Sequence, residues 1–129
     1  MAIAFLTLDE VLALHADQID RYGGRPGIRD LGLLSSAIAT PQASYEKTFL
    51  HQTLHEMAAA YLFHLVQNHP FIDGNKRTGL IAAIAFLGLN DVSLSADPDA
   101  LYRLVVGVAS GSMTKAEVAV FLQQNTRGA

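Results

Sequence analysis

One short segment in the middle of the chain combines the residue types that phosphate chemistry requires. Residues 69–78 read His-Pro-Phe-Ile-Asp-Gly-Asn-Lys-Arg-Thr. From residue 74 the loop is expected to enter a helix, so free backbone N–H groups and the positive end of the helix dipole should face an anion. Lys76 adds a compact charge and Arg77 a bidentate fork that suits phosphate oxygens. The predicted polyphosphate cradle consists of Gly74, Asn75, Lys76 and Arg77.

Two further residues of this segment predict a metal ligand and a general base for a reaction of the phosphate. Asp73 would be unfavourable beside phosphates by itself, but a carboxylate there is explained if it holds a Mg²⁺ ion that bridges phosphate oxygens. His69 is the type of residue that accepts a proton from a hydroxyl nucleophile near neutral pH. We therefore expect a general base, a metal ligand and an anion cradle within one loop.

A simpler interpretation treats the same residues as structural. His69 would precede a Pro turn, Asp73 and Gly74 would form a turn dipeptide, and Asn75 would cap the next helix. For any single residue this interpretation is as good as the functional one. A plain turn does not need an imidazole, a carboxylate, an amide, an amine and a guanidinium together, so the functional interpretation is favoured for the whole segment.

Helical periodicity on both sides predicts that the loop joins two core helices. Residues 52–68 keep their apolar positions at i, i+3 and i+4 spacing, and residues 75–89 are apolar almost all round. Thr7 to Glu10 has the pattern of a capping box and predicts a first helix that ends before Gly23. Asp30 is expected to cap a short helix that ends before Pro41.

The last third of the chain predicts two more helices. Asp97 followed by Pro98 indicates the start of one, and Thr114 to Glu117 has a second capping-box pattern. Only residues 92–94 suggest a strand. We therefore expect an all-α fold, a compact single-domain bundle of about six helices around the segment 75–89, with one domain over residues 1–129.

Composition excludes several classes of function. The net charge is −3 with no concentrated basic stretch, so nucleic acid is an unfavoured ligand, and there is no cysteine for a disulfide, a thiol nucleophile or a thiolate metal site. The N-terminal residues lack the pattern of a secretory signal, and the most apolar run is too short to span a membrane. The expected location is the cytoplasm.

The other histidines give weaker signals. His51 and His55 are one helical turn apart, but Gln52 stands where a zinc-protease helix needs Glu, so we expect histidines on the surface or at a helix start. His15 is expected to be a hydrogen-bonded, partly buried core residue, and His64 to be solvated or at a contact. The charged loop residues Arg25, Arg29 and Lys47, together with Tyr45, are expected to be ordinary solvated side chains and are not predicted site residues.

The segment 69–78 resembles the signature of the Fic/Doc superfamily, in particular its death-on-curing (Doc) branch. The resemblance continues through Arg21-Tyr-Gly-Gly and Gly27-Ile-Arg-Asp. Fic enzymes typically have Gly where this chain has Lys76, and a second Arg where it has Leu80. At both positions the chain resembles Doc rather than Fic. The resemblance implies a helical bundle around the motif helix, with Phe71 buried and anchoring the loop.

The resemblance also implies an activity, cofactors and partners. Fic members transfer AMP from ATP to a protein hydroxyl, whereas Doc members resemble kinases that transfer the γ-phosphate of ATP to a threonine of elongation factor Tu and halt translation. It implies His69 as general base, Asp73 as the Mg²⁺ ligand, and the toxin component of a toxin-antitoxin system. A Fic-like AMP transferase and a non-catalytic interaction domain are the alternatives.

Such a toxin needs an inhibitor. The Ser/Thr-x-x-x-Glu segment by which many Fic proteins inhibit themselves is absent from this sequence. The resemblance implies instead a Phd-like antitoxin, whose disordered tail would fold as a helix on an apolar groove of the toxin.

Overall fold

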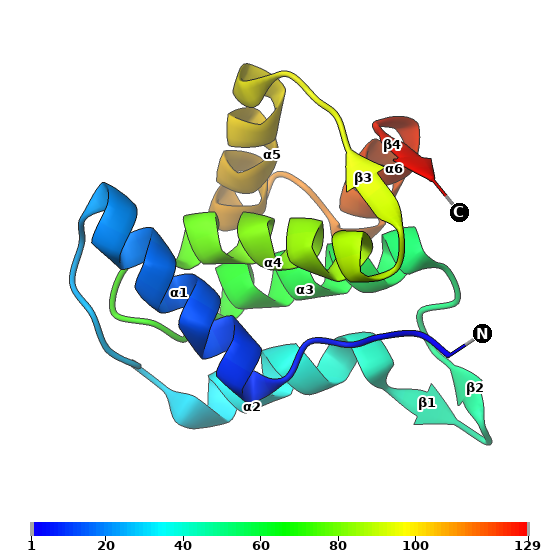
Figure 1. The fold of residues 1–129 in the computed structure, drawn as a ribbon, viewed down its shortest axis with the longest axis horizontal. Coiled ribbons are helices and arrows are strands. Elements are labelled where there is room, and N and C mark those ends of the chain that lie inside the picture. Colours follow the sequence, from blue (N-terminus) through cyan, green and yellow to red (C-terminus); the bar gives the residue numbers. More distant parts are fainter. Residues whose placement is uncertain (1, 129) are drawn as a thin grey trace.

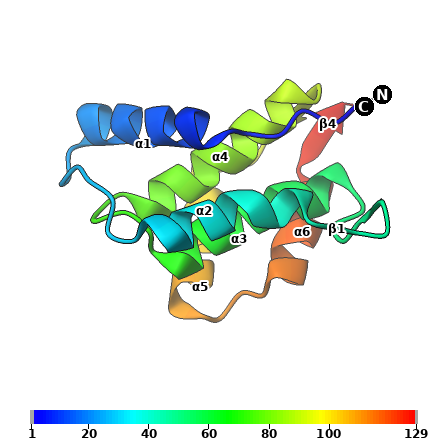
Figure 2. The same ribbon diagram turned by 90° about the horizontal axis from the view of Figure 1, so that it is seen from below.

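Six helices form the body of the protein over residues 2–128, and two of them make its centre. The computed structural model describes residues 2–128. Helices α3 (Leu54–Asn68) and α4 (Asn75–Leu89) pack side by side, and α1 (Leu8–Tyr22) and α2 (Leu31–Ala39) flank them (Figure 1). Helices α5 (Pro98–Ser110) and α6 (Lys115–Gln124) lie on the far side of α3 and α4 from α1 (Figure 2). This arrangement confirms the expected all-α bundle.

The central pair of helices approach each other closely because α4 carries a glycine at the contact. A Cβ atom at Gly79 would lie 2.7 Å from Cγ2 of Val66 and 3.1 Å from the carbonyl oxygen of Leu62. The middle of α3 is fully buried, from Met57 through Leu62. The loop between α3 and α4 therefore joins the two helices that pack closely at the centre of the fold.

The helix starts confirm the capping patterns and add one. Thr7, Thr53 and Thr114 each accept a hydrogen bond from the backbone of a glutamate three residues later, and that glutamate bonds back to the threonine N–H. The box at Thr53 was not expected, so α3 begins slightly later than residue 52. Asp97 occupies the predicted N-cap position of α5, but its side chain makes no capping bond.

Short strands complete the fold. The hairpin of β1 (Ser44–Tyr45) and β2 (Thr48–Phe49) follows the 3₁₀ turn Thr40–Gln42 and was not expected from the sequence. Strand β3 (Val92–Leu94) lies where the sequence suggested one, and it pairs antiparallel with β4 (Thr126–Gly128). This second pairing ties the C-terminal segment to the end of α4. Within residues 2–128, no helix has the length and apolar character needed to cross a membrane.

Candidate active site

The loop between α3 and α4 begins at a residue in an unusual backbone conformation. His69 forms the C-cap of α3 with φ 50° and ψ 53°, in the left-handed region. Glycine or asparagine usually occupies this position, because other side chains are strained there by about 1 kcal/mol or more. A histidine at this position is therefore kept at some cost to stability, which supports a role for its exposed imidazole.

Asn75 holds the loop in shape. Its side-chain Oδ1 accepts a hydrogen bond from the N–H of Phe71 at 2.9 Å, and its Nδ2 donates to the carbonyl oxygen of Phe71 at 3.0 Å. Asn75 is only 5% exposed. Both the oxygen and the nitrogen of the amide bond within the loop, so the side chain shapes the loop and the backbone N–H of Asn75 is the group left for an anion.

Phe71 anchors the loop to the core, as expected. Its side chain is 1% exposed and stacks on the imidazole of His15, with ring centroids 3.7 Å apart and an angle of 5° between the planes. Nε2 of His15 donates to the carbonyl oxygen of Asp73 at 2.8 Å. His15 is thus the buried, hydrogen-bonded histidine that the sequence indicated, and it supports the loop from α1.

The segment 23–30 forms a second support for the loop. The N–H of Ile72 donates to the carbonyl oxygen of Gly27 at 3.0 Å, and the carbonyl oxygen of Pro70 accepts from Arg29 at 2.7 Å and from Asp30 at 3.0 Å. These backbone bonds run along the loop on the side of α2. The path of the loop is therefore set by a segment some forty residues earlier in the chain.

Arg29 corrects one sequence-based expectation. Its Nε donates to the carbonyl oxygen of His69 at 2.6 Å, and its NH2 group donates to that of Asn68 at 2.8 Å. The guanidinium therefore binds the carbonyl groups that the end of α3 leaves unpaired, where the helix dipole is negative. Arg29 is not an ordinary solvated loop residue; it holds the backbone of His69.

Asp73 is fixed at the mouth of the loop by two backbone donors. The N–H of Arg25 donates to its Oδ2 at 3.1 Å and the N–H of Gly74 to its Oδ1 at 2.9 Å. These bonds, with a smaller contribution from the positive charge of Arg77, lower the pKa of Asp73 below its ordinary value. A Cβ at Gly24, where φ is 120°, would lie 2.9 Å from Oδ2, so this approach requires glycine. The carboxylate is ionised at neutral pH, as a metal ligand must be.

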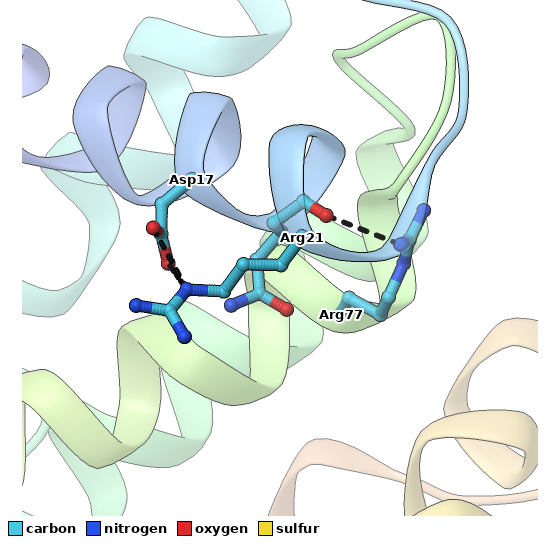
Figure 3. A network of polar contacts seen from close by, with 4 residues as sticks. Asp17, Arg21 and Arg77 are labelled. Carbon is cyan, nitrogen blue, oxygen red and sulfur yellow. Dashed lines mark hydrogen bonds and ion pairs between the residues drawn. The ribbon is translucent and has the colours of Figure 1, made fainter.

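Arg77 joins the pocket to α1. Its NH1 group donates to the carbonyl oxygen of Gln18 at 3.3 Å, and its NH2 group donates to that of Gly23 at 2.9 Å. Figure 3 shows Arg77 beside α1, with a hydrogen bond to that helix. The guanidinium also lies 5.9 Å from the centre of the Tyr22 ring. An arginine has five N–H donors, and these bonds use two of them. In Figure 3 the neighbouring pair of Arg21 and Asp17 lies on the exposed face of α1, apart from the loop.

Helix α4 begins without a side-chain cap. Its N-cap is Gly74, with φ 78° and ψ 17°, whereas α1, α2, α3 and α6 each start with a side chain that accepts from the first turn. Lys76 is exposed in this first turn. The N–H groups at the start of α4 are thus left for another acceptor, and the dipole of a helix of 15 residues favours an anion there.

The predicted site residues line one pocket. It has a volume of about 340 Å³ and lies between the end of α3, the start of α4 and the end of α5. All six candidates contribute to its wall: His69, Asp73, Gly74, Asn75, Lys76 and Arg77. Val66 and Gln67 on α3 and Ala109 on α5 complete it, and they were not predicted because nothing in their residue types marks them as site residues. In residues 2–128 no cluster of three or more His, Cys, Asp or Glu could hold a metal ion.

Comparison with known proteins agrees with this geometry. Residues 5–87 match the model of the Fic/DOC family. The chain belongs to this family. It is 39% identical over 118 residues to the "Protein kinase doc" of Escherichia phage P1, covering 90% of each protein. It is 46% identical over 78 residues to the "Toxin Doc" of Mycolicibacterium smegmatis, covering 60% of each. The resemblance to the Doc branch is thereby confirmed.

Proposed function

We propose that this protein is a Doc-type toxin that transfers the γ-phosphate of ATP to a hydroxyl group of a cellular protein. One observation carries the proposal: a single pocket brings together the imidazole of His69, the carboxylate of Asp73 and the uncapped start of α4. The 39% identity to a protein named as a kinase supports phosphate transfer rather than another use of the family fold.

The start of α4 would bind the phosphates. Backbone N–H groups there, Lys76, and the donors of Arg77 that α1 does not use supply hydrogen bonds and positive charge. Asn75 acts indirectly, because its side chain keeps the loop in the shape that directs these N–H groups. Positioning and electrostatic stabilisation of this kind usually dominate phosphoryl transfer.

Asp73 fits a Mg²⁺ ion. Mg²⁺ is commonly bound by one or two carboxylates, with water and substrate phosphates completing the octahedron, so one fixed carboxylate beside an anion site is a sufficient protein contribution. The lowered pKa of Asp73 keeps it charged at neutral pH. The ion, when bound with ATP, would neutralise charge on the phosphate oxygens.

His69 would act as the general base. Its side chain is exposed, so the hydroxyl of a folded protein target can reach it. It would accept the hydroxyl proton while the new bond to phosphorus forms and the bond to the leaving ADP breaks. A general base of this kind contributes on the order of 10²–10⁴-fold.

The proposed target is a threonine of elongation factor Tu, and the proposed inhibitor is a Phd-like antitoxin. Both come from the family resemblance. The surface beside the loop supports a helical partner: an apolar groove of about 370 Å³ lies between α1 and residues 26–28. Ile28 lines this groove and Ile72 lies against Gly27 in its wall, and both are large apolar side chains that are exposed. A bound antitoxin helix would cover this surface next to the pocket.

A series of variants tests the proposal. His69→Ala and Asp73→Ala should each abolish phosphate transfer and toxicity while the circular dichroism spectrum stays helical. Lys76→Gly should weaken phosphorylation and admit the Fic-like nucleotide pose, because Lys76 narrows the anion site. Arg21→Ala is the matched control, since Arg21 pairs with Asp17 on the exposed face of α1 and does not line the pocket. Full activity in a well-folded His69→Ala protein would exclude the general-base role.

A further inference from the structure

Three nitrogen-bearing side chains converge outside the pocket. His51 lies just before α3, His64 lies on α3, and Lys115 is the first residue of α6. Nζ of Lys115 is 3.0 Å from Nε2 of His51 and 3.1 Å from Nε2 of His64. All three side chains are partly buried, and the proposed phosphate transfer uses none of them.

The hydrogen bonds define where the imidazole lone pairs point. An ammonium group can only donate, so Nε2 of each ring accepts from Lys115 and each ring carries its proton on Nδ1. Both rings are neutral at physiological pH: burial, followed by the charge of Lys115, lowers the pKa of His51 and lowers that of His64 to about 4. Two Nε2 lone pairs are thus directed at one point, and a cation occupies it.

We propose that His51 and His64 form a binding site for a late first-row divalent metal ion such as Zn²⁺, which displaces the ammonium group of Lys115. Neutral imidazole nitrogen is a preferred ligand of these ions, at about 2.0–2.1 Å from the metal. The rings need to close on the metal by only about 1 Å relative to their distances from Nζ. No further His, Cys, Asp or Glu among residues 2–128 joins them as a third ligand, so water completes the coordination shell.

The two other potential metal ligands near His51, namely His55 and Glu56, are engaged in other hydrogen bonds. His55 follows His51 in the chain and lies in the first turn of α3, but its Nε2 bonds to Oγ1 of Thr126 at 2.8 Å, so it is directed elsewhere. The carboxylate of Glu56 is near His51, but its Oε1 accepts the N–H of Thr53 in the capping box. His55 therefore provides a matched control histidine.

Zinc titration calorimetry in excess Mg²⁺, which competes for the carboxylate of Asp73, tests the proposal. The wild-type protein should bind one Zn²⁺, His51→Ala and His64→Ala should each weaken that binding at least tenfold, and His55→Ala should leave it unchanged. Lys115→Met should tighten binding by about tenfold, because it removes a positive charge that repels the metal. Binding that is equal in wild type and His64→Ala, or absent in Lys115→Met, would overturn the proposal.

Nuclear magnetic resonance of the wild-type chain decides the matter even if a variant fails to fold. Zn²⁺ should shift the ring resonances of His51 and His64 together and leave those of His55 in place. The melting temperature should also rise with Zn²⁺, because a ligand that binds the folded state stabilises it. Shifts confined to His69 would place the metal in the phosphate pocket and contradict the assignment.

Discussion

The Asn75→Ala substitution separates the structural role of Asn75 from phosphate binding. In the wild-type protein its side chain satisfies both the N–H and the carbonyl group of Phe71, at 2.9 and 3.0 Å. Alanine leaves both backbone groups without these partners beside a core residue that is 1% exposed. We expect a larger loss of stability than the substitution of a residue that only contacts the ligand would cause.

The size of the loss follows from the two bonds. A buried donor or acceptor left unsatisfied costs about 1–3 kcal/mol, so two of them cost about 2–6 kcal/mol. Water that enters the space left by the side chain should satisfy these groups in part, so we expect a loss of about 2–4 kcal/mol. For a domain of this size each kcal/mol lowers the melting temperature by roughly 4 °C, which predicts a decrease of about 8–16 °C.

Denaturant unfolding of the ligand-free protein measures this loss, with Asn68→Ala as the matched control. Nδ2 of Asn68 makes one bond, to the carbonyl oxygen of Leu33 at 3.0 Å, so its removal should cost only about 1 kcal/mol. A loss below 1 kcal/mol in Asn75→Ala, together with lost ATP binding, would refute the structural role and return the side chain of Asn75 to the cradle.

Three further perturbations have defined outcomes. Arg29→Ala should destabilise the exposed end of α3 by about 1 kcal/mol and reduce kcat, with partial recovery in Arg29→Lys; unchanged kcat would contradict the positioning role. Gly79→Ala should lower the free energy of unfolding by about 1–3 kcal/mol, because its Cβ would lie 2.7 Å from Cγ2 of Val66 on α3. A Cβ at Gly88 on the same helix has no atom within 4 Å, so Gly88→Ala should be neutral or stabilising. Equal effects of the two substitutions would contradict the close packing of α3 and α4. Burial and Lys115 lower the pKa of His64 to about 4, so the fold favours the neutral form of this histidine. Its contribution to the free energy of unfolding should be fully present above about pH 6.5 and should fall by about 1–2 kcal/mol as the pH drops toward 4. A His64→Gln protein with the same pH dependence would contradict this.

Local signals in the sequence were sufficient for most of the fold. The helix starts that Thr7, Asp30 and Thr114 cap could be located, because a cap and its partner lie within four residues of each other, whereas the cap at Thr53 was missed. The bounds 75–89 of α4 follow from a glycine before an apolar run. The members of the pocket could be predicted because they belong to one contiguous loop.

What the sequence did not show depends on contacts between distant segments. The role of Arg29 requires knowing that residues 23–30 lie along the loop at 69–74, which no local pattern encodes. The convergence of His51, His64 and Lys115 depends on the packing of α6 against α3. The hairpin β1–β2 has strands of two residues, too short to produce an alternating pattern.

The most direct test of the account measures the mass that a target protein gains. Elongation factor Tu is incubated with this protein, Mg²⁺ and ATP, and its intact mass is then determined, with His69→Ala as the control. Our account predicts a gain equal to one phosphate, located on a threonine, with ADP as product and no gain in the control. A gain equal to AMP, or a phosphate added equally by His69→Ala, would contradict it.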